Sequence, residues 1–209
     1  MTKQSSQYVQ LASKSPRRRE LLTQIGVSYQ LVDVDVPEEQ DAGESAEAYV
    51  FRLAQSKAKT GFDASPQTVT LGADTIVVCD DKVLEKPRDE ADCLAMLRLL
   101  SGRSHQVLTA MCLYDGDKML TRVSHTHVRF KVLTDAWIRA YWRTGEPADK
   151  AGAYGIQGKG ALFVHDIQGS YTCVVGLAIE PLSDMLAEFG VAMWYDHDAG
   201  AAKEECTAV

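Results

Sequence analysis

The sequence predicts an α/β fold, and three observations support this prediction. Segments with the apolar pattern of strands alternate with segments of helical periodicity along the chain. Residues 69–79 are almost entirely apolar, which is typical of a central strand covered on both faces. A chain of 209 residues, with 45% hydrophobic and 24% charged residues, can bury one core of ordinary composition. We therefore expect a single domain over residues 1–195 and a disordered tail over residues 196–209.

The first elements follow from local signals. A strand at 8–12 precedes a helix at 16–25, for which Ser15 is the expected N-cap. Valines at every second position predict a half-buried strand at 29–36, which leads into an acidic loop at 38–43.

The next predicted helix runs from Ser45 to about Thr60 and stops at Gly61. Lys57 lies on its apolar side, so this lysine either extends along the edge of the core to solvent or points into a site. The spacing alone favours the first interpretation.

The remaining elements rest on caps, turns and apolar periodicity. They are a turn at Asp80-Asp81, a short segment at 83–87, a helix at 90–100 capped by Asp89, strands at 105–114 and 118–132, a helix from Thr134 to Gly145, a Gly-rich loop at 146–160, strands at 163–166 and 171–179, and a helix at 182–189.

Three arginines, Arg17, Arg18 and Arg19, occupy the first turn of the helix at 16–25. The dipole of a helix is positive at this end, so each cation costs about 0.3–1 kcal/mol there. A helix N-terminus with guanidinium groups beside it binds phosphate well. The alternative is an ordinary solvated surface cluster.

Asp74 lies in the middle of the apolar stretch 69–79. A carboxylate buried in a strand needs a partner, a cation or a metal ion. Gly72 beside it permits close approach of a ligand or of another backbone. The alternative is a strand that bends at Gly72 and leaves Asp74 at its edge.

Composition excludes several classes of function. The net charge of −7 argues against broad nucleic-acid binding. No apolar run reaches the length of about 20 residues that spans a bilayer, so we expect no membrane partner. Five cysteines without a CxxC pair indicate a reducing compartment, and we expect a cytoplasmic protein.

Residue chemistry alone predicts a protein that binds a phosphorylated small molecule and possesses the groups to hydrolyse it. Cationic groups would hold the phosphates while carboxylates hold a divalent metal ion and activate water. Gln157, in the Gly-rich loop, has an amide that suits reading a base edge. The sequence contains no Walker A motif, no GxGxxG after a strand and no GxSxG motif.

Six stretches of the chain form a recognisable series: LASKSPRRRELL at 11–22, RLAQSKA at 52–58, LGADTIVV at 71–78, LEKPRDEADCLAMLRLLSG at 84–102, DKAGAYGIQG at 149–158 and GSYTCVVGL at 169–177. Together and in this order, they resemble the Maf family of nucleoside triphosphate pyrophosphatases. The resemblance implies a fold related to the inosine-triphosphate pyrophosphatases, with a long mixed sheet flanked by helices and a cleft between two lobes. It also implies hydrolysis of a nucleoside triphosphate to the monophosphate and pyrophosphate with Mg²⁺ or Mn²⁺, and it leaves a homodimer open.

The resemblance assigns roles by motif. Asp74 matches the general base of the family, and it would share a metal ion with Glu38. Lys57 and Lys86 match polar catalytic positions. Ser13, Arg17 and Arg18 match the phosphate-binding loop, while Arg19 is left as a solvated helix residue.

Arg17, Thr75 and Gln157 match the positions that separate substrate subgroups, and here they resemble the subgroup that acts on dTTP, UTP and modified pyrimidine nucleotides. The alternatives are a 7-methyl-GTP or broad-specificity pyrophosphatase, and a non-catalytic nucleotide-binding regulator of cell division. The chain departs from the family pattern at Cys173, where many members have Asn, and at Ala178-Ile179, which replaces Pro-Leu.

Overall fold

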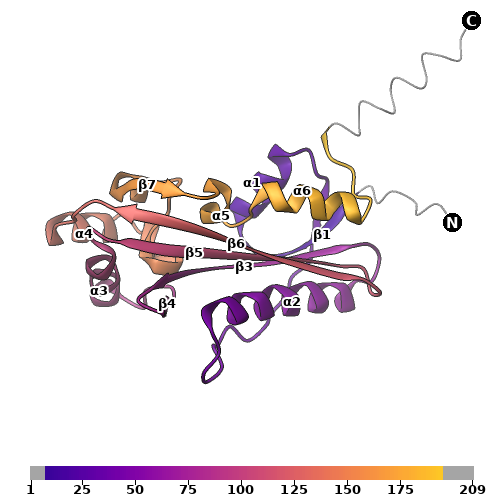
Figure 1. Ribbon diagram of the computed structural model, residues 1–209, viewed down its shortest axis with the longest axis horizontal. Helices are drawn as coiled ribbons and strands as arrows, with labels where there is room; N and C mark the ends of the chain where they lie inside the picture. Colours follow the sequence, from indigo (N-terminus) through magenta and orange to yellow (C-terminus); the bar gives the residue numbers. More distant parts are fainter. Residues whose placement is uncertain (1–7, 195–209) are drawn as a thin grey trace, which may run out of the picture.

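The computed structural model describes residues 8–194, and these residues form an α/β fold as expected. A seven-stranded mixed sheet has the order β2-β1-β3-β5-β6-β7, and β4 pairs with β3 (Figure 1). Its strands are β1 (Val9–Ala12), β2 (Tyr29–Leu31), β3 (Thr70–Cys79), β4 (Lys82–Leu84), β5 (Ser104–Tyr114), β6 (Met119–Phe130) and β7 (Val164–Gln168). The tail predicted at 196–209 lies outside the described residues.

Helices cover both faces of this sheet. They are α1 (Pro16–Gln24), α2 (Ala46–Ala64), α3 (Glu90–Leu100), α4 (Asp135–Trp142), α5 (Tyr171–Val175) and α6 (Ile179–Glu188), with 3₁₀ turns η1 (Glu146–Asp149), η2 (Ala151–Ala153) and η3 (Lys159–Phe163). Figure 1 shows α2 on one face of the long strands and α1, α5 and α6 on the other. None of the helices within residues 8–194 is long and apolar enough to cross a bilayer.

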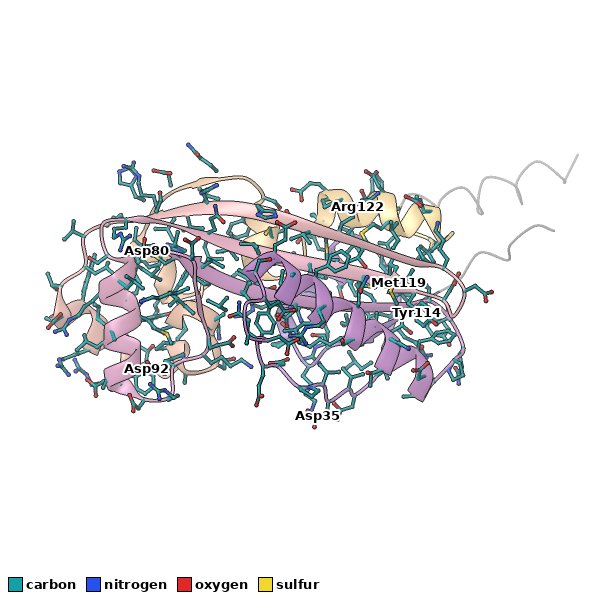
Figure 2. All side chains as sticks on the ribbon, turned by 60° about the horizontal axis from the view of Figure 1, so that its bottom comes forward. Asp35, Asp80, Asp92, Tyr114, Met119 and Arg122 are labelled. Atoms are coloured by element: carbon teal, nitrogen blue, oxygen red, sulfur yellow. The ribbon has the colours of Figure 1, made fainter. Side chains whose placement is uncertain are left out.

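The long strands β3, β5 and β6 form the centre of the sheet. In Figure 2, Asp80, which follows β3, lies near one end of the molecule, and Tyr114 and Met119 lie near the other. These last two residues pair across the β5–β6 turn. The long strands therefore extend along most of the molecule.

One edge of β3 is paired only at its two ends. Residues 70–72 pair with β1, and residues 77–79 pair with β4. Between them, residues 73–76 have no strand partner on that edge in the described part of the chain. Because side chains alternate across a strand, this gap presents Asp74 towards α2 and Thr75 towards α1.

The close packing of α2 on β3 depends on Gly72. A Cβ atom at this position would lie 2.3 Å from both the Ala54 oxygen and the Ala58 nitrogen. The close approach that the sequence predicted at Gly72 is therefore an approach by the backbone of α2. It brings Lys57, on the same face of α2, to Asp74.

Several predicted boundaries are wrong, and the last helix, for example, begins at Ile179 and not at residue 182. Helix α2 continues through Gly61 to Ala64, because Gly61 packs against the side chains of Ala12 and Thr70 and does not end the helix. Strand β2 stops at Leu31, because β1 is short and its register with β2 ends there.

The strand predicted at 171–179 is also wrong, since residues 171–175 form α5. The Ser170 hydroxyl accepts a hydrogen bond from the Cys173 nitrogen, and Gly176, with a φ of 133°, ends the helix. This N-cap outweighs the strand preference of the β-branched residues between them.

Four cysteines, Cys79, Cys93, Cys112 and Cys173, are buried free thiols, and Cys206 lies outside the described residues. Among these four, Cys173 is fully buried against the sheet, where its Sγ lies 3.3 Å from the Ser124 oxygen of β6. The departure from the family pattern at this position therefore lies in the core.

We predict that Gly72→Ala lowers the free energy of unfolding by about 3 kcal/mol, because the new methyl group meets backbone atoms that cannot move independently. Gly43→Ala is the control: its φ is 79° and a Cβ there meets nothing within 4 Å, so we expect only about 1 kcal/mol of backbone strain. Urea denaturation of both variants measures this difference. Equal losses would contradict the close contact of α2 with β3.

Candidate active site

A cavity of about 990 Å³ opens at the unpaired edge of β3. This volume lies at the upper end of the range for small-molecule sites. Its walls come from the start of α1, the middle of α2, the exposed edge of β3, the segment after β4 and the Gly-rich loop. All nine sequence-predicted site residues line it: Ser13, Arg17, Arg18, Glu38, Lys57, Asp74, Thr75, Lys86 and Gln157.

Lys57 joins two carboxylates in this cavity. Its Nζ donates to Asp74 Oδ1 and to Glu38 Oε1, each at 2.6 Å. The side chains of Lys57 and Asp74 are 10% and 12% exposed, whereas that of Glu38 is 44% exposed. The interpretation of Lys57 as a lysine that extends to solvent is therefore wrong, because α2 lies too close to β3 and the carboxylates bind its ammonium group.

The electrostatic environment keeps the Glu38 carboxyl ionised. Burial opposes its ionisation, but the hydrogen bond and charge of Lys57, followed by the charge of Lys86, outweigh burial, so the pKa of Glu38 is lowered. Lys86 Nζ lies 3.9 Å from Glu38 Oε2 and is largely exposed. Glu85, its neighbour, differs: burial, and then the charge of Asp74, raises the pKa of Glu85.

Arg18 connects the start of α1 to β3 and to the backbone after α5. Its guanidinium donates from Nη1 to Ser13 Oγ at 2.9 Å and from Nη2 to Thr75 Oγ1 at 3.2 Å. Its Nε donates to the Gly176 oxygen, just after α5, at 3.0 Å. Each terminal nitrogen of Arg18 carries a second N–H, and these are the groups with which it can reach a ligand.

Arg17 and Gln157 both line the cavity. Arg17 is half-buried, and its Nε is buried without a hydrogen-bond partner among residues 8–194. Gln157, in the Gly-rich loop, lines the cavity and is exposed to solvent. Arg19 does not line the cavity, as expected for a residue outside the site. The Ser15 hydroxyl makes no capping bond.

The carboxylates suit a cation that a substrate also binds. Among the described residues, no group of three or more His, Cys, Asp or Glu side chains could hold a metal ion. Mg²⁺ is commonly bound by one or two carboxylates together with substrate phosphates and water. Asp74 and Glu38 fit this arrangement. Lys57 binds only one oxygen of each carboxylate, so the second oxygen of each is left for a cation.

Three residues near these groups were not predicted as site residues. Glu85 lines the cavity beside Lys86, and Tyr49 donates to Glu85 Oε1 at 3.4 Å. Thr109 Oγ1 lies 2.9 Å from Thr75 Oγ1 and donates to the Cys173 oxygen. The sequence offered one indication that Glu85 belongs to the site, namely its position next to Lys86. Tyr49 offered none, because it fits the apolar stripe of α2.

The family model of the Maf-like proteins matches residues 8–189. This protein belongs to the Maf family. A dTTP/UTP pyrophosphatase of Saccharophagus degradans is 53% identical over 188 residues, which cover 88% of this chain and 90% of the relative. Proteins of the same name from Vibrio parahaemolyticus and Aromatoleum aromaticum are 49% and 47% identical, and the matches cover 86% and 87% of this chain and 95% of each relative. The family resemblance seen in the six motifs is thus confirmed.

We predict that Lys57→Met lowers the free energy of unfolding by about 1–3 kcal/mol at neutral pH, because it leaves two neighbouring carboxylates without their cation. Methionine keeps the length and apolar character of the stem. Lys59→Met, on the exposed face of the same helix, should change the stability by less than about 0.5 kcal/mol. If urea denaturation finds the two variants equally stable, Lys57 does not hold the carboxylates in place.

Proposed function

We propose that this protein hydrolyses dTTP and UTP, and modified pyrimidine triphosphates of similar shape, to the monophosphate and pyrophosphate. The observation that carries the proposal is the Lys57–Asp74 contact at 2.6 Å, beside guanidinium groups in a cavity of about 990 Å³. The names of three relatives at 47–53% identity support the choice of substrates. A binding protein without catalysis would not need a carboxylate buried in the middle of a central strand.

In the proposed reaction, Asp74 is the general base. Lys57 holds Oδ1 of Asp74, so Oδ2 is the oxygen that accepts the proton of the attacking water. The water oxygen forms a bond to the α-phosphorus, and the bond between that phosphorus and the oxygen bridging to the β-phosphate breaks. Pyrophosphate leaves with the bridging oxygen, and Asp74 returns its proton to solvent.

The cationic groups of the cavity would hold the phosphates and stabilise the charge that develops on pyrophosphate. Arg17 is the strongest candidate, because its guanidinium lines the cavity with an unpartnered buried Nε. Lys86 is largely exposed and can turn towards a phosphate. Ser13 and Arg18 would fix the start of α1, whose N–H groups also favour anions.

A divalent ion, Mg²⁺ or Mn²⁺, bound by Asp74 and Glu38 would neutralise the phosphate oxygens. Lys57 would then keep both carboxylates facing the cavity. Thr75 and Gln157 are the proposed determinants of base choice, one inside the cavity and one at its rim. We further propose a cytoplasmic location, which the four buried free thiols support, and assembly as a homodimer remains a prediction.

The test is the release of pyrophosphate from a panel of triphosphates (dTTP, UTP, CTP, ATP and 7-methyl-GTP) with Mg²⁺ or Mn²⁺. We expect dTTP and UTP to have the highest kcat/KM. Turnover of 7-methyl-GTP without turnover of dTTP or UTP would refute the substrate assignment. Binding of all these nucleotides without hydrolysis would instead favour the non-catalytic regulator.

We predict that Asp74→Asn lowers kcat for dTTP by about 10³-fold, because an amide cannot accept the proton of water. KM should change far less, since the shape of the side chain is kept. Asp166→Asn is the matched control and should leave kcat unchanged, because Asp166 lies on β7 in an exposed ion pair with Arg129 of β6. Full activity of Asp74→Asn would remove Asp74 as the base.

A further inference from the structure

The carboxylate of Glu146 lies inside the curve of the Gly-rich loop. Its Oε1 accepts hydrogen bonds from the Tyr141 hydroxyl at 2.8 Å and from the Gly160 nitrogen at 3.0 Å. Its Oε2 accepts from the Lys159 nitrogen at 2.8 Å. Burial opposes ionisation of this carboxyl, but the backbone donors outweigh it, and the pKa of Glu146 is lowered. Glu146 is therefore a charged acceptor for backbone N–H groups, which is a strong form of hydrogen bond.

Tyr141 extends this contact to the other side of the loop. Its hydroxyl accepts from the Gly155 nitrogen at 3.0 Å while donating to Glu146. The ring of Tyr141 is fixed in the core, with its centroid 4.9 Å from that of Phe163 in an edge-to-face contact. One carboxylate and one phenol thus bind backbone N–H groups both before and after Gln157.

The glycines of the loop are explained by the same two side chains. A Cβ atom on Gly158 would lie 2.5 Å from the Glu146 carboxyl carbon and both of its oxygens. A Cβ atom on Gly160 would lie 2.8 Å from the Tyr141 hydroxyl. The loop backbone therefore comes close to Glu146 and Tyr141, and these close approaches favour glycine at both positions.

We propose that Glu146 is a positioning residue for substrate choice: it holds residues 155–160 in the curve that presents Gln157 to the base of the nucleotide. This inference rests on the proposed function. Gln157 makes no hydrogen bond of its own among the described residues, so its direction depends on the backbone that carries it. An amide can donate or accept at either end, so a base edge is distinguished only if the amide is held in one orientation.

The proposal predicts a separation of KM from kcat. In Glu146→Gln, one oxygen is replaced by NH₂, and this group would face a backbone N–H that also donates. We expect KM for UTP to rise about tenfold and the ratio of kcat/KM for UTP over CTP to fall about tenfold, which corresponds to one misplaced hydrogen bond. The value of kcat should stay within about threefold, because Asp74 lies on β3 and Lys57 on α2, outside the Gly-rich loop.

A double-mutant cycle separates positioning from general loss of structure. If Glu146 acts through Gln157, the variant with both Glu146→Gln and Gln157→Ala should have the same kcat/KM as Gln157→Ala alone. Additive effects, or an unchanged KM and UTP/CTP ratio in Glu146→Gln, would overturn the proposal. Glu188→Gln, in an exposed ion pair with Lys118, is the matched control and should leave all three quantities unchanged.

Tyr141→Phe is a second variant in case Glu146→Gln folds poorly. It keeps the ring in the core and removes the hydroxyl, so it should raise KM for UTP and lower the UTP/CTP ratio in the same direction by a smaller factor. An unchanged KM in this variant would also count against the proposal. If the unaltered protein hydrolyses neither UTP nor dTTP, the proposed function fails; if it does and these variants behave as the control, only the role of Glu146 fails.

Discussion

The incomplete pairing of one edge of β3 is the constraint on which the site depends. Pairing with β1 ends at Gly72, opposite Ala12, and pairing with β4 covers only Val77–Cys79, so the edge of the central strand is uncovered between them. Successive residues of this stretch point to opposite faces. Asp74 therefore meets Lys57 from α2, while Thr75 meets Arg18 from α1. A fully paired strand would have kept these two sets of groups in separate layers.

Charge pairing organises the cavity around this gap. The ammonium group of Lys57 pairs with both Asp74 and Glu38, and the lysine is almost fully buried. Desolvating an unpaired carboxylate costs several kcal/mol, roughly, so the lysine makes the position of Asp74 in a central strand tolerable. The same contact leaves one oxygen of each carboxylate for a cation or water. Stability and the proposed chemistry thus depend on one ammonium group.

Two parts of the site are held by contacts that span long stretches of chain. Arg18 connects α1 with Thr75 and with the carbonyl of Gly176. Glu146 and Tyr141 hold the Gly-rich loop from inside its curve. The hydrogen bonds of Arg18, Glu146 and Tyr141 are made to other groups of the protein. In the proposed enzyme, they define where the groups that touch the nucleotide can lie.

The sequence by itself determined the α/β alternation, most helix caps and the membership of Asp74, Arg17 and the other predicted residues in one cavity, because these depend on local periodicity and on motifs. Helical spacing alone misjudged Lys57, although the motif resemblance placed it in the site, and the sequence misjudged the end of α2 at Gly61 and the element at 171–179. In each case a neighbour distant in the sequence, or a cap that outweighs strand preference, decided the outcome. Only the tertiary structure decided that Lys57 lies between two carboxylates and that Glu146 holds the Gly-rich loop, because both depend on close approaches of backbone that no spacing along the chain encodes.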